Sequence, residues 1–162
     1  MLVKRLTNVL TYQSTNIPSS MSSTFFNYPT GEQRQMPTFD LAFWGQRSQR
    51  DWRKLLAVMQ TLRFRPNEVA IAADARADGV YLVGFGRFSS NGATIPEGHA
   101  IGIGSFFDNH PHDHAVTCHT DGELLHLSRT AFDTFAAREP ELARAVLFEL
   151  GRILSLNLRS NQ

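Results

Sequence analysis

Four of the six histidines lie in one short stretch, GSFFDNHPHDHAVTCH, from Gly104 to His119. Three of them, His110, His112 and His114, alternate in HPHDH. Imidazole nitrogens bind transition metals, and two histidines one residue apart on a strand project to the same face. Imidazole also changes its charge near neutral pH, so it can contact an anion. The pattern is compatible with a metal site, an anion contact or a surface loop.

Other catalytic combinations are missing from the sequence. Asp40, Asp51 and Asp74 have no second carboxylate or nucleophile at a telling spacing. Cys118 and His119 are neighbours, but adjacent residues on a strand point to opposite faces, so we expect a buried structural thiol. Because no set of acid, base and nucleophile can be assembled, we expect a protein that is not an enzyme and holds no cofactor.

Composition favours a single neutral domain. The chain has 162 residues, of which 42% are hydrophobic and 19% charged, enough for one hydrophobic core. Sixteen Lys and Arg balance fifteen Asp and Glu, so a nucleic-acid partner is not expected. The single cysteine favours a reducing, cytoplasmic location. No apolar run reaches the roughly 18 to 20 residues that a membrane helix needs, so we expect no direct membrane insertion.

The two ends of the chain differ from its middle. Residues 1–38 are rich in polar residues and turn formers and are predicted to form an arm, whose aromatic residues Phe25, Phe26 and Tyr28 pack on the domain or on a partner. From Arg50, RDWRKLLAVMQTL has apolar residues at spacings of three and four, which predicts a helix ending near Leu62.

A series of short strand-like segments follows, up to Ser128. They are RFRPNEVAIAA, GVYLVGFGRFSS, HAIGIGSFF, HAVTCHT and GELLHLS, separated by Pro, Asn, Asp and Gly. This pattern is typical of a small barrel or roll, and the short connections favour antiparallel pairing. Next come a short helix, a break at Pro140 and a longer apolar helix. The predicted domain covers residues 39–158, with a tail at 159–162, and its fold class is mainly β with flanking helices.

Three motifs, in this order and spacing, resemble the cyclic nucleotide-binding domain family. They are PNEV at Pro66 to Val69, DGVYLVGFGRF from Asp78 to Phe88, and TDGELLHLSRTAFDTF from Thr120 to Phe135. Asn67 stands where the family usually has Gly, and Asn tolerates the left-handed conformation. The resemblance covers about Phe39 to Leu158. It implies a β-roll of the double-stranded β-helix or jelly-roll type, as in bacterial catabolite-activator-type regulators.

The family binds its ligand through a phosphate-binding cassette, Phe-Gly-Glu followed by Pro-Arg-x-Ala. Here Ile101-Gly102-Ile103 and Pro111-His112-Asp113-His114 stand at those places. The resemblance therefore implies a degenerate cassette whose ligand-binding candidates are Gly102, Ile103, His110, His112, Asp113 and His114. Ile103 cannot accept the hydrogen bond of a ribose hydroxyl, and His112 lacks the guanidinium fork.

The loss of these two contacts can be weighed. Each charge-assisted hydrogen bond contributes about 1.5 to 3 kcal/mol, so cyclic-nucleotide binding weakens by roughly two to four powers of ten. Asp113 adds repulsion of an anion. The expected function is that of a regulatory module that does not bind cyclic AMP.

Two alternatives keep the histidines functional. In one, His112 and His114 contact a non-standard nucleotide or anion, which makes the protein a sensor. In the other, Gly104 to His112 resembles the first half of the cupin pattern, and His110, His112 and His114 bind a metal. The expected cupin Glu is missing, because Val116 or Thr117 stands there. The simplest interpretation is a solvated loop, with His119 facing outward and His126 half-buried.

The long C-terminal helix is apolar on more than one side, because Val146, Leu147, Phe148 and Leu150 crowd together. Packing on the roll does not account for all of them. We therefore expect a protein partner, or a homodimer, held through this helix and the N-terminal arm.

Overall fold

The computed structural model describes residues 43–44, 47–76 and 78–160. The chain divides into two units, Met1–Pro37 and Thr38–Gln162, and every described residue belongs to the second. The predicted arm, with Phe25, Phe26 and Tyr28, lies outside the described residues.

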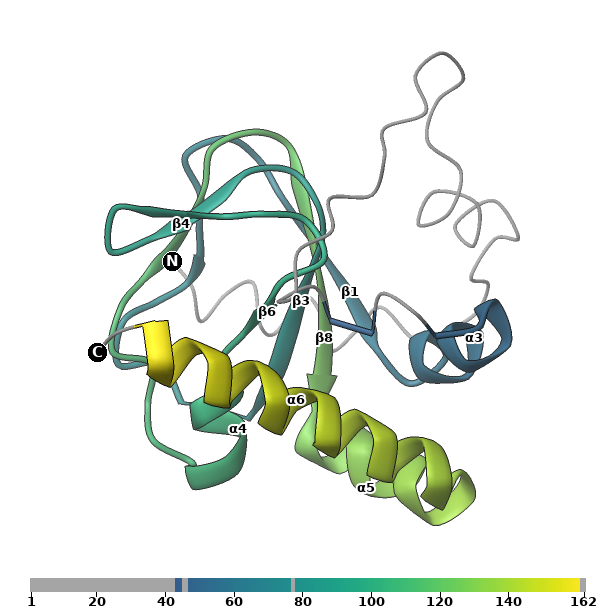
Figure 1. Ribbon diagram of the computed structural model, residues 1–162. Helices are drawn as coiled ribbons and strands as arrows, with labels where there is room; N and C mark the ends of the chain where they lie inside the picture. The colour runs from purple at the N-terminus through teal and green to yellow at the C-terminus, as the bar shows by residue number, and fades with distance from the viewer. Residues whose placement is uncertain (1–42, 45–46, 77, 161–162) are drawn as a thin grey trace. The chain divides into compact units, whose positions relative to one another are not determined.

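Two four-stranded antiparallel sheets form the β-roll (Figure 1). The first sheet has the order β1-β8-β3-β6, with β1 at Gln60–Phe64, β8 at Gly122–Ser128, β3 at Gly79–Phe85 and β6 at Ala100–Ile101. The second has the order β2-β7-β4-β5, with β2 at Val69–Ile71, β7 at Val116–Cys118, β4 at Phe88–Ser90 and β5 at Ala93–Ile95. The predicted mainly antiparallel β fold is confirmed.

Tight turns connect the short strands. Asn67 has a φ of 68°, the left-handed conformation expected at this position of the PNEV motif. Asn91 and Gly92 have φ values of 48° and 76° and join β4 to β5. A two-residue hairpin of type I′ needs a positive φ at both residues, and Asn-Gly supplies it at low cost.

The interior of the roll is a closely packed apolar cluster of Ile71, Val83, Phe88, Val116, Cys118 and Leu124. Val83 and Leu124 face each other across β3 and β8. Side chains alternate along a strand, so their neighbours Leu82 and Leu125 lie on the opposite face, where they are also buried. Both faces of the first sheet are therefore covered at these positions, and α5, at Arg129–Arg138, contacts β8.

Two helix predictions need correction. The helix α3 spans Gln49–Leu56, and the Ser48 side chain accepts a hydrogen bond from the Asp51 N–H at 3.2 Å. It does not reach Leu62, because Leu62 pairs with Leu124 in β1 and packs on the interior cluster. The predicted strand HAIGIGSFF is also interrupted, since β6 is followed by the short helix α4 at Ile103–Asp108.

The C-terminal helices follow the prediction. The helix α5 is followed directly by α6, at Pro140–Ser160, and Pro140 occupies the first position of α6, where its missing N–H is tolerated. Figure 1 shows α6 running beside α5 and past α4, and contacts join α6 to both. None of the helices in the described part of the chain is long and apolar enough to cross a membrane.

Candidate functional site

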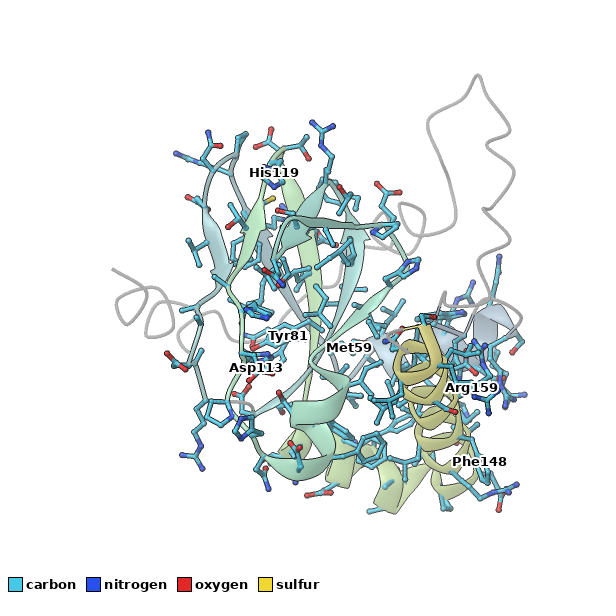
Figure 2. All side chains as sticks on the ribbon, turned by 60° about the vertical axis from the view of Figure 1, so that its left-hand side comes forward. Met59, Tyr81, Asp113, His119, Phe148 and Arg159 are labelled. Atoms are coloured by element: carbon cyan, nitrogen blue, oxygen red, sulfur yellow. The ribbon has the colours of Figure 1, made fainter. Side chains whose placement is uncertain are left out.

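Tyr81 and His126 form a polar layer inside the roll. They are direct partners in the β3–β8 register, on the same face as Val83 and Leu124. Their rings stack, with centroids 4.4 Å apart and an interplanar angle of 16°. The side chain of Tyr81 lies within the roll in Figure 2, whereas His119 lies at the end of the roll far from the helices. On the inner face of β3 and β8, the apolar cluster is therefore followed by the two polar aromatic side chains of Tyr81 and His126.

Asp78 lies at the rim of this layer, just before β3. Its Oδ1 is 3.2 Å from Nε2 of His126, an ion-pair distance, although its side chain is 60% exposed. The approach does not have the geometry of a hydrogen bond, and the buried Nε2 of His126 has no hydrogen-bond partner. The contact with His126 holds the pKa of Asp78 below its usual value.

The cassette loop, residues 109–115 between α4 and β7, brings His112 to the same layer. The Asp74 N–H donates to the His112 carbonyl at 2.8 Å, and the His112 N–H donates to the Ala75 carbonyl at 3.2 Å. The ring of His112 lies 6.1 Å from that of Tyr81, and the residue is only 7% exposed. Its Nε2 is buried without a hydrogen-bond partner. The expectation of a fully solvated loop is therefore wrong for His112.

Gly102 makes room for the His112 ring. A Cβ at Gly102 would lie 2.7 Å from Cε1 of His112, closer than carbon atoms pack. Gly102 also has a φ of 79°, which L side chains rarely adopt. The glycine thus allows both the turn into α4 and the close approach of the ring.

The remaining histidines do not join His112. His110 and His114 are exposed, and His110 Nε2 lies 3.6 Å from Asp113 Oδ1 on the surface. His119 is exposed, with Nε2 2.6 Å from the Ser89 hydroxyl oxygen. His126, expected to be half-buried, is only 8% exposed. Across the residues that the structure describes, no three or more His, Cys, Asp or Glu side chains are grouped to hold a metal ion.

Arg129 connects α4 to α5. Its guanidinium donates to the Phe106 carbonyl near the end of α4 and lies 5.4 Å from the centroid of the Phe106 ring. Its own N–H donates to the Asp78 carbonyl at 2.8 Å. The Phe106 ring also meets Phe132 edge-on, at 5.6 Å between centroids. The segment that holds Gly102 and Ile103 is therefore coupled to the C-terminal helices.

The family model described as cyclic nucleotide-binding domain matches residues 61–139. Over these residues the chain is similar to that family, which confirms the resemblance of the three sequence motifs. Comparison with curated protein sequences gave no match.

Solved structures agree with the cyclic nucleotide-binding domain fold. A cyclic nucleotide-binding domain from Methylobacillus flagellatus KT is 22% identical, with a TM-score of 0.65 over 74% of this chain and 73% of that one. The N-terminal domain of a transcriptional regulator from Streptomyces coelicolor A3(2) is 20% identical, with a TM-score of 0.63 over 75% and 95%. The Thermus thermophilus catabolite activator protein is 20% identical, with a TM-score of 0.62 over 73% and 58%. This chain thus spans little more than half of the Thermus protein.

The interior of the roll favours neutral side chains. Burial lowers the pKa of His112, and the nearby Asp78 and Asp113 carboxylates oppose this only in part. Burial also raises the pKa of Tyr81 to about 12. At neutral pH the two groups are therefore an uncharged imidazole and an uncharged phenol.

The sequence alone did not identify Asp78, Tyr81, His126 and Arg129 as members of this site. The sequence signal that could have found them is their place in the family motifs. Asp78 and Tyr81 belong to DGVYLVGFGRF, and His126 and Arg129 belong to TDGELLHLSRTAFDTF. Of the candidates from the cassette, only Gly102 and His112 meet inside the roll. Ile103 is buried at the start of α4, and His110, Asp113 and His114 lie on the surface.

Proposed function

We propose that this chain is a non-enzymatic regulatory module whose cyclic nucleotide-binding domain has lost its affinity for cyclic AMP and acts through protein contacts. The observation that supports this best is the position of His112. It stands where the family cassette has Arg, and its ring packs inside the roll against Gly102 and beside Tyr81. The domain's own side chain therefore occupies space beside the cassette.

Ile103 supports the same proposal from the other side of the cassette. It stands at the family Glu position, in the first turn of α4, and is only 5% exposed. A buried alkyl chain offers no acceptor to a ribose hydroxyl. A nucleotide entering here would have to displace His112 without gaining the two charge-assisted contacts that the family uses.

The helix α6 offers a surface for protein contacts. Val146 and Leu150 are fully buried, whereas Phe148 is 70% exposed, Leu158 61% and Leu147 37%. A Cβ at Gly151 would have nothing within 4 Å, so this face of the helix is open. Large apolar side chains exposed together favour association, and we propose a second copy of the chain as the occupant, with the N-terminal arm contributing to the same contact.

Calorimetric titration tests the loss of ligand binding. Metal-free wild type and an Ile103→Glu, His112→Arg double variant are each titrated with cyclic AMP, cyclic GMP and cyclic dinucleotides. We expect no heat of binding from the wild type and measurable binding by the double variant. Micromolar binding by the wild type would refute the proposal and favour the alternative, a nucleotide sensor that uses its histidines.

Light scattering tests the α6 surface. We expect the wild type to form a dimer that dissociates in Phe148→Asp, because a carboxylate cannot be buried in an apolar contact at low cost. Asn157→Asp is the matched control, since it adds the same charge at an exposed position on the opposite side of the same helix. A wild-type monomer, or equal masses for the two variants, would contradict a homodimer through this face.

A further inference from the structure

Two buried histidines share a single acidic neighbour. His112 and His126 are 7% and 8% exposed, and the Nε2 atom of each is buried without a hydrogen-bond partner. Tyr81 contacts both rings and is neutral. The charged groups that act on His112 are Asp78 beside β3, Asp113 on its own loop, and His126 on β8 when it is protonated.

The two histidines differ in what lies near their Nε2 atoms. Nε2 of His126 lies 3.2 Å from Oδ1 of Asp78, an ion-pair distance. A proton on His112 would place a positive charge in the same layer on a buried N–H that has no acceptor. An unpaired buried charge is strongly unfavourable, so the charged ring is more stable in water than in the roll.

The loop that carries the His112 ring lies next to solvent. His112 lies on the cassette loop, whose other histidines are exposed, and its neighbour Asp113 has a side chain that is 76% exposed. Two backbone hydrogen bonds, to Asp74 and Ala75, hold the loop at His112. A ring that swings outward leaves the apolar interior and approaches a solvated carboxylate.

We propose that His112 is a proton-dependent switch, packed against Gly102 when neutral and released together with the cassette loop when charged. Release removes a contact at the residue that precedes α4. The helix α4 is joined to α5 through Phe106, Phe132 and Arg129, and α6 contacts both helices. Mild acid therefore loosens the cassette and the support of α6. The proposal deepens the proposed function by assigning a regulatory input to the same closed cassette.

Hydrogen–deuterium exchange of the full chain, without any nucleotide, tests the switch. Protection factors are measured at pH 7.5 and pH 5.5 and corrected for the intrinsic exchange rate. One proton displaced from an ordinary histidine pKa changes the opening equilibrium by about tenfold over this interval. We expect peptides covering residues 103–116 to lose about tenfold in protection, while peptides of the β4–β5 hairpin do not change.

The variants assign this loss to a residue. His112→Phe keeps a buried ring that cannot be protonated, and we expect it to abolish the loss. Should it fail to fold, His112→Gln serves the same purpose. His110→Phe and His114→Phe, at exposed positions of the same loop, are the matched controls and should keep the loss.

Three results would overturn the switch: protection that does not depend on pH, a loss that persists in His112→Phe, or a loss that disappears only in His126→Gln. None of these bears on nucleotide binding or on the mass of the α6 variants. A flat pH response with no cyclic-nucleotide binding would remove the switch and leave the proposed function standing. Cyclic AMP binding by the wild type would refute the proposed function whatever the pH response.

Discussion

Replacing Gly102 with alanine tests how tightly the His112 ring is packed. An alanine at a φ of 79° costs about 1–2 kcal/mol in the left-handed region. The new Cβ would also lie 2.7 Å from Cε1 of His112, and an overpacked contact of this kind costs typically about 1–3 kcal/mol. We therefore expect Gly102→Ala to lower the free energy of unfolding by about 2–5 kcal/mol, measured by urea denaturation.

Two other glycines separate the contributions. Gly92 has a φ of 76°, but a Cβ there has nothing within 4 Å, so Gly92→Ala should lose only about 1–2 kcal/mol. Gly104, within α4, has the same open surroundings without the positive φ, and Gly104→Ala should gain about 0.5–1 kcal/mol. The difference between the Gly102 and Gly92 variants measures the packing cost alone.

A double variant tests whether the His112 ring is the group that the new Cβ at position 102 contacts. In Gly102→Ala, His112→Ala the ring is gone, so the extra cost at Gly102 should disappear as a coupling of about 1–3 kcal/mol. If Gly102→Ala destabilises no more than Gly92→Ala, the ring does not rest against Gly102 in solution. A cassette closed by the domain's own His112 side chain would then be refuted.

Three further predictions concern the same site. The absorbance of ionised tyrosine, taken as wild type minus Tyr81→Phe, should titrate at about pH 12, because burial raises the pKa of Tyr81; a midpoint near 10 would show that the ring is in water. The pKa of Asp78 is lowered by His126, so Asp78→Asn should reduce the free energy of unfolding above pH 3.8, and the deficit should vanish as the pH falls through the lowered pKa. A deficit that persists in strong acid would contradict this pairing. Arg129→Ala should cost about 2 kcal/mol in urea unfolding, for the hydrogen bond to the Phe106 carbonyl and the contact with its ring, and Arg138→Ala on the exposed side of α5 should cost less than 0.5 kcal/mol.

The roll and its C-terminal helices were predictable because their signals are local. Short apolar runs between turn-forming residues, as in GVYLVGF and GELLHLS, predict strands, and the Pro140 break separates two helices. The end of α3 was not predictable in this way, because Met59 and Leu62 fit the spacing of a helix as well as that of a strand. Pairing of β1 with β8 places Leu62 in a strand. The Asn91-Gly92 dipeptide, by contrast, is a local signal that favours the hairpin turn between β4 and β5.

The site was less predictable because it depends on contacts between distant residues. The stacking of Tyr81 on His126 requires one register of β3 against β8, and a shift by one residue would turn one of the two rings to the other face. The burial of His112 depends on the backbone bonds of its loop to Asp74 and Ala75. The residue types in HPHDH suggested solvent, and the fold of the loop put one of the three histidines inside.

Chemical labelling of the single cysteine of the chain can report the rate at which the roll opens. Cys118 is fully buried in the interior cluster, its thiol donates to the Thr120 carbonyl at 2.8 Å, and burial raises its pKa. A thiolate-specific reagent therefore cannot reach or use this sulfur until the two sheets separate. The chain has no other thiol, so all labelling comes from Cys118. When the reagent reacts before the sheets close again, the rate of labelling equals the rate at which the sheets separate.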